Sequence, residues 1–208
     1  MMKYPKFSCL LVLFCAVVFI SFSAPRAEAR IGDGVETLER RLFASGGIMY
    51  RDAATQANRR RGMPYLRFME LMPGSVDVRI YFKTADGRRI RGSELDERQT
   101  LPGWDIHVVY VGGRSVVEVY KRSQSINEFE LNQLLSVHAE GSFWKKVERN
   151  DQEPSAFGYE MIRDDGKVRA RKMGGDGILF VDARLDTLLA EKNREDLLEK
   201  APLSVEGF

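Results

Sequence analysis

The most restrictive feature of this sequence is a stretch in which apolar and polar residues alternate strictly. Val76, Val78, Ile80 and Phe82 are each followed by a polar or amphipathic residue within 76–83. Successive side chains of a β-strand point to opposite faces of its sheet, so a period of two predicts a strand with one buried face. The chain must therefore build a sheet, which needs further strands and a covering layer.

A pair of glycines predicts a hairpin later in the chain. Gly112-Gly113 stands between the apolar segments 106–111 and 115–121. A tight hairpin turn needs positive φ angles, which glycine adopts without strain. The two segments are therefore expected to pair as antiparallel strands.

Four more segments predict strands, because turn-forming residues bound them. They are residues 65–71, 157–163, 167–172 and 178–181. A turn at Pro73-Gly74 would join 65–71 to the alternating strand, and Asp164-Asp165-Gly166 would close a second hairpin.

Helices are expected at the ends of the strand runs. Residues 33–44 carry apolar residues at the helical period, with Asp33 as the cap and Gly46-Gly47 as the stop. The segment Ser125-Ile126-Asn127-Glu128 fits a capping box, in which the serine and the glutamate satisfy free backbone N–H groups. The helix that it starts should end at Gly141. Residues 53–61 and 185–200 predict two more helices, the second amphipathic.

This order of elements predicts an α+β fold with an antiparallel sheet built from hairpins and covered by packed helices. A parallel sheet would need a crossover helix between each pair of strands, and the sequence offers none. We expect a single exported domain over residues 30–208. It contains two helix-then-strands blocks, 30–122 and 123–208, that share no residue-level repeat.

Residues 1–29 have the pattern of a secretory signal peptide. Lys3 and Lys6 precede an uncharged apolar run over residues 7–24, and Ala27-Glu28-Ala29 offers small residues at a cleavage site. An uncleaved anchor is the alternative, since 18 apolar residues nearly span a bilayer. Both interpretations export the rest of the chain, to the periplasm or to the medium, and limit membrane contact to this segment.

Cysteine and charge exclude several classes of function. Cys9 and Cys15 are the only cysteines, and both precede residue 30, so the exported part has no thiol for a disulfide, a nucleophile or a metal. Removal of residues 1–29 leaves 29 of the 32 basic and 29 of the 30 acidic residues. This balance gives nucleic-acid binding no electrostatic support.

No constellation in the sequence predicts catalysis, a metal or a cofactor, so an enzyme is the less favoured class. His107 and His138 are the only histidines. His138 stands late in its helix, where a cation suits the helix dipole. His107 stands on the opposite strand face from Ile106 and Val108, and nothing in the sequence places the two histidines together. Glycines at 174–177 precede no lysine that could hold a phosphate.

The residues 84–104 form a long excursion between two strands, and such loops often carry function. Possible interaction residues are the arginines of this excursion and the two tryptophans, because tryptophan anchors many interfaces. They are Arg88, Arg89, Arg91, Trp104 and Trp144. A second arginine cluster occupies residues 59–61.

Ile31-Gly32, followed by Leu38, Leu42 and Gly46-Gly47, resembles the start of small bacterial envelope modules of the BamE or SmpA-like kind. That resemblance implies a glycine-led helix on a short antiparallel sheet. Those modules are often shorter lipoproteins, whereas this chain is longer and lacks the lipid-bearing cysteine.

The whole sequence is also similar to uncharacterised exported bacterial proteins that carry a Gly-x-x-Trp-Lys-Lys segment, here Gly141 to Lys146. Neither resemblance supplies a site residue.

The sequence therefore predicts a non-catalytic binding or assembly module of the cell envelope with a protein partner. The loop 84–104, the sheet edges and the C-terminal helix are its expected contact surfaces. The alternatives are an envelope hydrolase that uses carboxylates and a carrier of a small ligand, which would need an apolar pocket.

Overall fold

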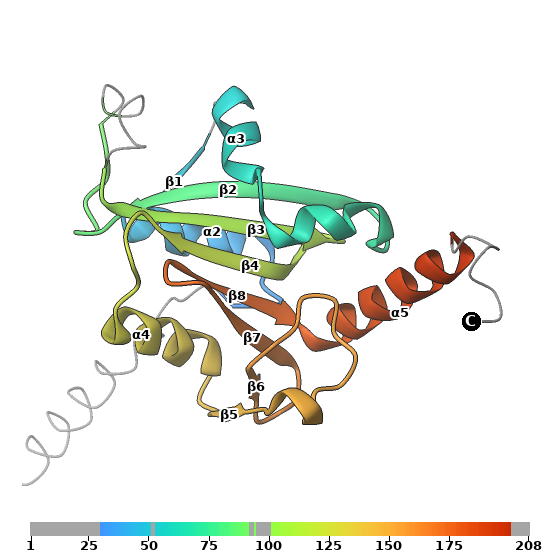
Figure 1. Cartoon of the computed structure of the whole chain (residues 1–208). Coiled ribbons are helices and arrows are strands. Elements are labelled where there is room, and N and C mark those ends of the chain that lie inside the picture. Colours follow the sequence, from blue (N-terminus) through green and yellow to red (C-terminus); the bar gives the residue numbers. More distant parts are fainter. Residues whose placement is uncertain (1–29, 51–52, 92–93, 95–100, 201–208) are drawn as a thin grey trace, which may run out of the picture.

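A computed structural model describes residues 30–50, 53–91, 94 and 101–200 (Figure 1). Its centre is one antiparallel sheet of eight strands, in the order β1-β2-β3-β4-β8-β7-β6-β5. The α+β prediction is confirmed. The predicted signal peptide, with Cys9 and Cys15, lies outside the described residues. Within the described part of the chain, no helix has both the length and the apolar character needed to cross a membrane.

Each half of the chain supplies four neighbouring strands, laid side by side in sequence order. The two sets meet where β4 pairs with β8. The first four strands are β1 (Ile48–Met49), β2 (Val76–Thr84), β3 (Gly103–Val111) and β4 (Arg114–Arg122). The others are β5 (Trp144–Lys146), β6 (Met161–Arg163), β7 (Val168–Met173) and β8 (Gly177–Asp182).

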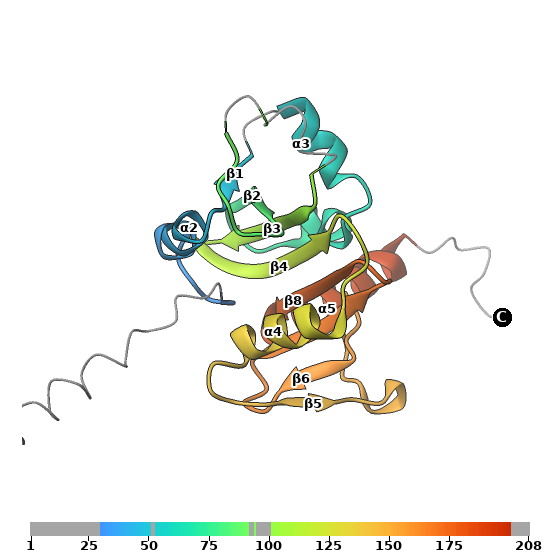
Figure 2. The same cartoon turned by 90° about the vertical axis from the view of Figure 1, so that its left-hand side faces the viewer.

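Helices cover both faces of the sheet (Figures 1 and 2). They are the α-helices α2 (Val35–Ala44), α3 (Ala53–Arg60), α4 (Glu128–Ala139) and α5 (Ala183–Glu199), and the 3-10 helices η1 (Pro64–Leu71) and η3 (Arg149–Asp151). Leu38 and Leu42 of α2 and Leu131 of α4 pack on one face, which we call the α2/α4 face. Phe68 of η1 and Leu189 of α5 pack on the other, the η1/α5 face.

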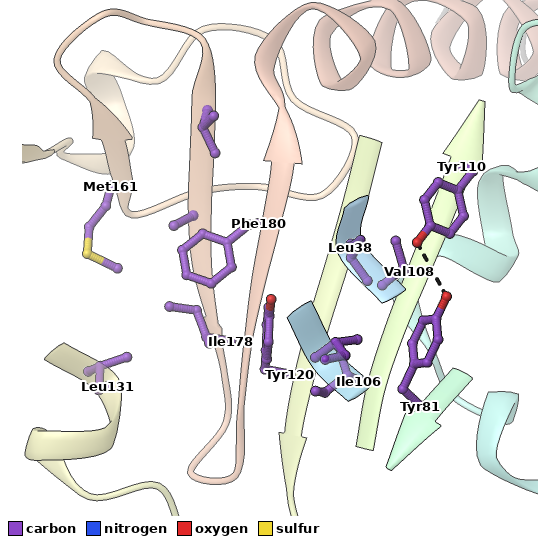
Figure 3. Packing of buried hydrophobic residues seen from close by; sticks show 13 residues of the cluster. Leu38, Tyr81, Ile106, Val108, Tyr110, Tyr120, Leu131, Met161, Ile178 and Phe180 are labelled. Carbon is purple, nitrogen blue, oxygen red and sulfur yellow. Dashed lines mark hydrogen bonds between the residues drawn. The ribbon is translucent and has the colours of Figure 1, made fainter. Parts of the chain in front are cut away.

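The alternation of each central strand divides its residues between these two faces. Ile106, Val108 and Tyr120 join the core of the α2/α4 face, as Figure 3 shows. Val109 and Val119 join the core of the η1/α5 face. Both faces of the central strands are therefore buried, which explains why these segments read as nearly continuous apolar runs.

The strand expected at residues 65–71 is wrong, because this segment is the 3-10 helix η1. Pro64 at its first turn has no N–H to give to a sheet, and its fixed φ suits a helix start. Tyr65 and Phe68 are three residues apart, so in a 3-10 helix they point to the same side, and both are buried. The burial of these two rings fixes the helix on the sheet.

Two predicted caps are also corrected. The capping box of α4 is formed by Asn127 and Glu130, each side chain bonding the backbone of the other, rather than by Ser125 and Glu128. Gly34, rather than Asp33, is the cap of α2, without a side-chain bond. Asp33 instead forms an ion pair with Arg41.

A buried ion pair joins the second half of the sheet to α5. The Arg169 guanidinium lies 2.9 Å from Asp186, and the side chains are 1% and 0% exposed. The Asp186 carboxylate also accepts hydrogen bonds from the Ser155 hydroxyl and from the backbone N–H groups of Ala156 and Phe157. One carboxylate therefore fixes both the start of α5 and the loop before β6.

We expect Asp186→Ala to lower the free energy of unfolding by about 3–5 kcal/mol. It removes the buried one of the two acids that pair with Arg169, the other being Glu153 at 2.6 Å. It also leaves the buried N–H groups of Ala156 and Phe157 without their side-chain acceptor. Urea denaturation followed by circular dichroism measures this loss. The control is Asp196→Ala, which removes an acid from the exposed pair with Lys200 and should change stability little. Equal effects of the two substitutions would contradict a dominant role for the buried pair.

Candidate functional site

An open groove of about 600 Å³ lies on the α2/α4 face, at the end of the sheet where β2 ends and β3 begins. Trp104 and Ile106 of β3 and Tyr120 of β4 contribute to its lining from the sheet. Trp104 and Ile106 are two residues apart on β3, and Ile106 pairs directly with Tyr120 on β4, so the three side chains lie on the same face of the sheet. The sheet therefore gives the groove an apolar and aromatic floor.

The two helices and a turn form the walls. α4 contributes Phe129, Leu134 and Val137, and α2 contributes Leu42 near its end. Phe129 is 72% exposed, the largest exposed fraction among the large hydrophobic residues of the described chain. An aromatic side chain is thus presented to solvent on the wall of the groove.

The wall nearest α2 depends on a close backbone approach. Gly46, with φ of 88°, follows α2, and a Cβ placed on it would lie 2.0 Å from the carbonyl oxygen of Gly87. Any larger residue would force these two segments apart. Gly46 therefore holds the turn after β2 against the end of α2.

Among the described residues, the groove cation Lys83 has no acidic partner. Arg41 pairs with Asp33, and Arg122 pairs with Glu130 at 2.9 Å. Lys83 is half-buried, burial lowers the pKa of its ammonium, and it has no acidic partner among the described residues. The groove therefore combines an apolar floor with one partly desolvated positive charge.

A buried polar cluster lies beside this floor, on the same face. The Tyr120 hydroxyl donates to Oε2 of Glu118 at 2.7 Å and lies 3.3 Å from Nε2 of His138. Glu118 is 0% exposed, and His138 is 1% exposed and stacks on Phe180 with ring centroids 3.7 Å apart. Tyr120 is the member of the cluster that also lines the groove.

Burial determines the ionisation of the cluster. Desolvation, partly opposed by the hydrogen bond from Tyr120, raises the pKa of Glu118 to about 7. Desolvation, assisted by the charge of Arg163, lowers the pKa of His138 to about 3. His138 is therefore a neutral core residue, although a cation at this place near the end of its helix would suit the helix dipole.

The arginines singled out in the sequence do not line the groove together. Arg88 is exposed and pairs with Glu94 at 2.9 Å and with Asp86 at 3.5 Å. The backbone N–H of Arg91 also donates to Glu94, and Arg89 is exposed. Glu94 thus organises this part of the excursion, whose residues 92–93 and 95–100 lie outside the described part of the chain.

The two tryptophans have different positions. Trp104 lines the groove, with the Arg122 guanidinium 5.4 Å from its ring centroid. The indole N–H of Trp144 donates to the carbonyl of Leu135 at 2.7 Å, and its ring lies 5.7 Å from that of Phe180. Trp144 therefore fastens α4 to the sheet.

The two histidines lie on opposite faces. His107 is buried on the η1/α5 face, where Nδ1 lies 2.9 Å from the Tyr65 hydroxyl. Desolvation, assisted by Arg59, Arg60 and Lys121, lowers the pKa of His107 to about 3. In the described part of the chain, no group of three or more histidine and acidic side chains could hold a metal ion.

The C-terminal half of α5 extends beyond the sheet (Figure 1). Leu197 and Leu198 near its end are 56% and 67% exposed. This helix was expected to be a contact surface, and these two side chains are its exposed apolar residues.

Comparison of the chain with protein-family models, with curated proteins and with solved structures gives no match.

We expect Glu118→Gln to remove a pH dependence of stability. The folded protein binds the Glu118 proton more tightly than the unfolded chain, whose ordinary pKa is 4.5. The stability of the wild type should therefore fall relative to E118Q as the pH rises through 4.5 to 7, by about 3 kcal/mol in total, and stay level above.

Urea unfolding at a series of pH values measures this difference, in which the contributions of the two histidines cancel. The exposed Glu36→Gln is the control for the loss of one acidic side chain. A difference between wild type and E118Q that does not change with pH would show that Glu118 does not bind a proton on folding.

Proposed function

We propose that this protein is a non-catalytic binding module of the cell envelope, which holds a segment of a partner protein in the groove between α2 and α4. The segment would present apolar side chains to the floor and a carboxylate to Lys83. The observation that carries the proposal is the half-buried Lys83 beside an apolar floor, which has no acidic partner among the described residues. Export follows from the signal peptide expected at residues 1–29.

The apolar side chains of the groove supply the first argument. Phe129 is exposed, and Trp104 is half-buried. Aromatic residues in central pockets contribute a large share of the binding free energy at protein interfaces. Covering Phe129 would remove an exposed aromatic surface from water, which favours association.

Lys83 supplies the second argument. Partial burial removes water from around its ammonium group, and no acidic side chain among the described residues pairs with it to compensate. A carboxylate of the partner would form a charge-assisted hydrogen bond in a site that excludes part of the water. Such a pair would also select against partners that present a positive charge there.

The shape of the groove favours a protein segment over a small molecule. A carrier site usually buries most of its ligand, whereas this groove is open along the sheet surface. A chain segment lying between two helices needs no enclosure, because flanking residues of the partner cover it. The carrier hypothesis is therefore the second outcome of the experiment below.

The hydrolase alternative has less support. Carboxylate catalysis needs two acids across a cleft with different proton affinities. The acids of the groove, Asp86 and Glu130, pair with Arg88 and Arg122. The carboxyl group with a raised pKa, Glu118, is fully buried.

Photocrosslinking from the groove tests the proposal in intact cells. A photoreactive amino acid replaces Gln133, which lines the groove. The control position is Phe143, an exposed residue that follows α4. A protein adduct from position 133 alone, which is then reproduced with the purified partner, would support the proposal. Adducts to lipid or to another small molecule would favour the carrier, and equal adducts from both positions would contradict a specific groove.

We expect Phe129→Ser to weaken binding of the crosslinked partner by about tenfold or more, because it removes an aromatic anchor. Lys83→Glu should weaken binding similarly, since it places a like charge against the carboxylate. Phe143→Ser is the matched control, an exposed phenylalanine whose loss should leave the affinity unchanged. Calorimetric titration of the purified pair measures all three, and an equal loss with F143S would overturn the assignment of the site.

A further inference from the structure

A second pocket, of about 390 Å³, lies on the η1/α5 face at the same end of the sheet. β3 contributes Asp105 and His107, and β4 contributes Lys121. Arg59 and Arg61, from the end of α3 and just after it, lie on another side. The arginine cluster at residues 59–61 therefore comes together with a buried histidine that stands far from it in the sequence.

His107 belongs to this lining and carries a buried polar atom without a hydrogen-bond partner among the described residues. Its Nδ1 lies 2.9 Å from the Tyr65 hydroxyl, and its Nε2 has no hydrogen-bond partner among the described residues. The side chain is 0% exposed. A buried N–H or ring nitrogen without a partner costs free energy, so a group that bonds Nε2 would be stabilised there.

The hydrogen bond to Tyr65 identifies Nε2 as the donor. If Nδ1 donated to Tyr65, the buried Tyr65 hydroxyl proton would have no acceptor, and Nε2 would keep an unused lone pair. If Tyr65 donates to Nδ1, Nε2 carries the ring proton, and it is the one group left unsatisfied. The second tautomer leaves fewer buried polar groups unpaired, so the pocket contains an N–H donor that needs an acceptor.

Charge also favours an acceptor that is an anion. The lining holds four cationic side chains and two acidic ones, Asp105 and Asp176. Arg59 neutralises Asp105 in an ion pair. Lys121 lies 3.7 Å from Asp176, and both side chains are more than 40% exposed, so this pair is weak and Lys121 can turn to a ligand. Arg61 is exposed and has no acidic partner in the described part of the chain.

We propose that this pocket, which we call the His107 pocket, binds a phosphate group. The Nε2–H of His107 would donate to one phosphate oxygen, while Arg61 and Lys121 would neutralise the charge at the mouth. Ser123, which also lines the pocket, carries a hydroxyl that can donate to another oxygen. The groove for the partner lies on the other face, so this site is independent of the proposed function.

A phosphate group fits the pocket better than a carboxylate does. At neutral pH it carries up to two negative charges and offers three or more acceptor oxygens. Among the described residues, the pocket has one cation without an acidic partner and one that is weakly paired, Arg61 and Lys121. It also has two neutral donors, His107 on β3 and Ser123 just after β4. Its volume falls in the range of small-molecule sites, roughly 300–1,000 Å³.

The imidazole ¹⁵N signals provide the test, because the chain has two histidines. The protein is purified in the form that the expressing cell makes from the full sequence, and it is titrated with inorganic phosphate at constant ionic strength. We expect saturable shifts at His107 and none at His138, which is buried on the opposite face. Equal shifts of both histidines, or no shift of His107 up to millimolar phosphate, would overturn the proposal.

Surface substitutions test the contribution of the cations without touching the core. Arg61→Ala and Lys121→Ala should each weaken phosphate binding by about tenfold. The control is Lys145→Ala, which removes an exposed lysine that pairs with Asp164 on the other half of the sheet. If K145A weakens phosphate binding as much as R61A does, the loss comes from the change in net charge, and the pocket is not a specific phosphate site.

Vesicles identify the source of the phosphate. The protein is sedimented with vesicles of phosphatidylcholine alone and with vesicles that also contain a phosphatidic acid. Binding to the second kind, lost in R61A, would assign a lipid headgroup. Binding of inorganic phosphate without vesicle binding would assign a soluble phosphate compound.

Discussion

The pairing of β4 with β8 is the interaction on which the rest of this structure depends. It joins Val117–Lys121 to Gly177–Val181 and makes one sheet from strands supplied by two halves of the chain. Each half alone would be a four-stranded sheet with an unpaired apolar edge. The buried cluster, the groove and the His107 pocket all include residues of β4.

The junction between β4 and β8 also contains a buried carboxyl group, that of Glu118. Glu118 and Phe180 are cross-strand partners, and His138 reaches them from α4. A carboxyl group in such a place destabilises the fold whenever it ionises, so a hydrocarbon would serve stability better. Tyr120 connects this carboxyl group to the groove, since its hydroxyl bonds Glu118 and the residue lines the floor. A ligand that alters the environment of Tyr120 would therefore also alter the proton affinity of Glu118.

Much of the fold could be predicted from local patterns. The alternation in β2 and the Gly112-Gly113 turn follow from chain geometry within a few residues, and both are confirmed. For residues 65–71, the strand interpretation overlooked Pro64 and the three-residue spacing of Tyr65 and Phe68. The sequence also could not show that Tyr65 bonds His107, 42 residues away. The short strand β5 has exposed lysines and little apolar alternation, and it exists through pairing with β6.

The sequence predicted single residues of the candidate site, but not how they come together. Trp104 was singled out, whereas Lys83 and Phe129 were not, because nothing local distinguishes them. Their importance arises from burial and from the absence of partners, which depend on where α2 and α4 pack. A glutamate inside an alternating apolar strand was the one available signal for the buried cluster, since Glu118 stands between Val117 and Val119.

The order of the strands has a consequence for how the chain reaches its folded state. All strand pairs except β4 with β8 join neighbours in sequence. Three of these pairs, β3 with β4, β6 with β7 and β7 with β8, are closed by short turns and form at low entropic cost. β8 is the last strand in the described part of the chain, and until it pairs, β4 presents a long apolar edge of the kind that recruits foreign strands. The interval between completion of the first half and docking of β8 is therefore the period in which the chain is most exposed to aggregation. Under the proposed export, the chain would pass through that interval outside the cytoplasm, where the folding rate of its second half, or a chaperone of that compartment, would set its length.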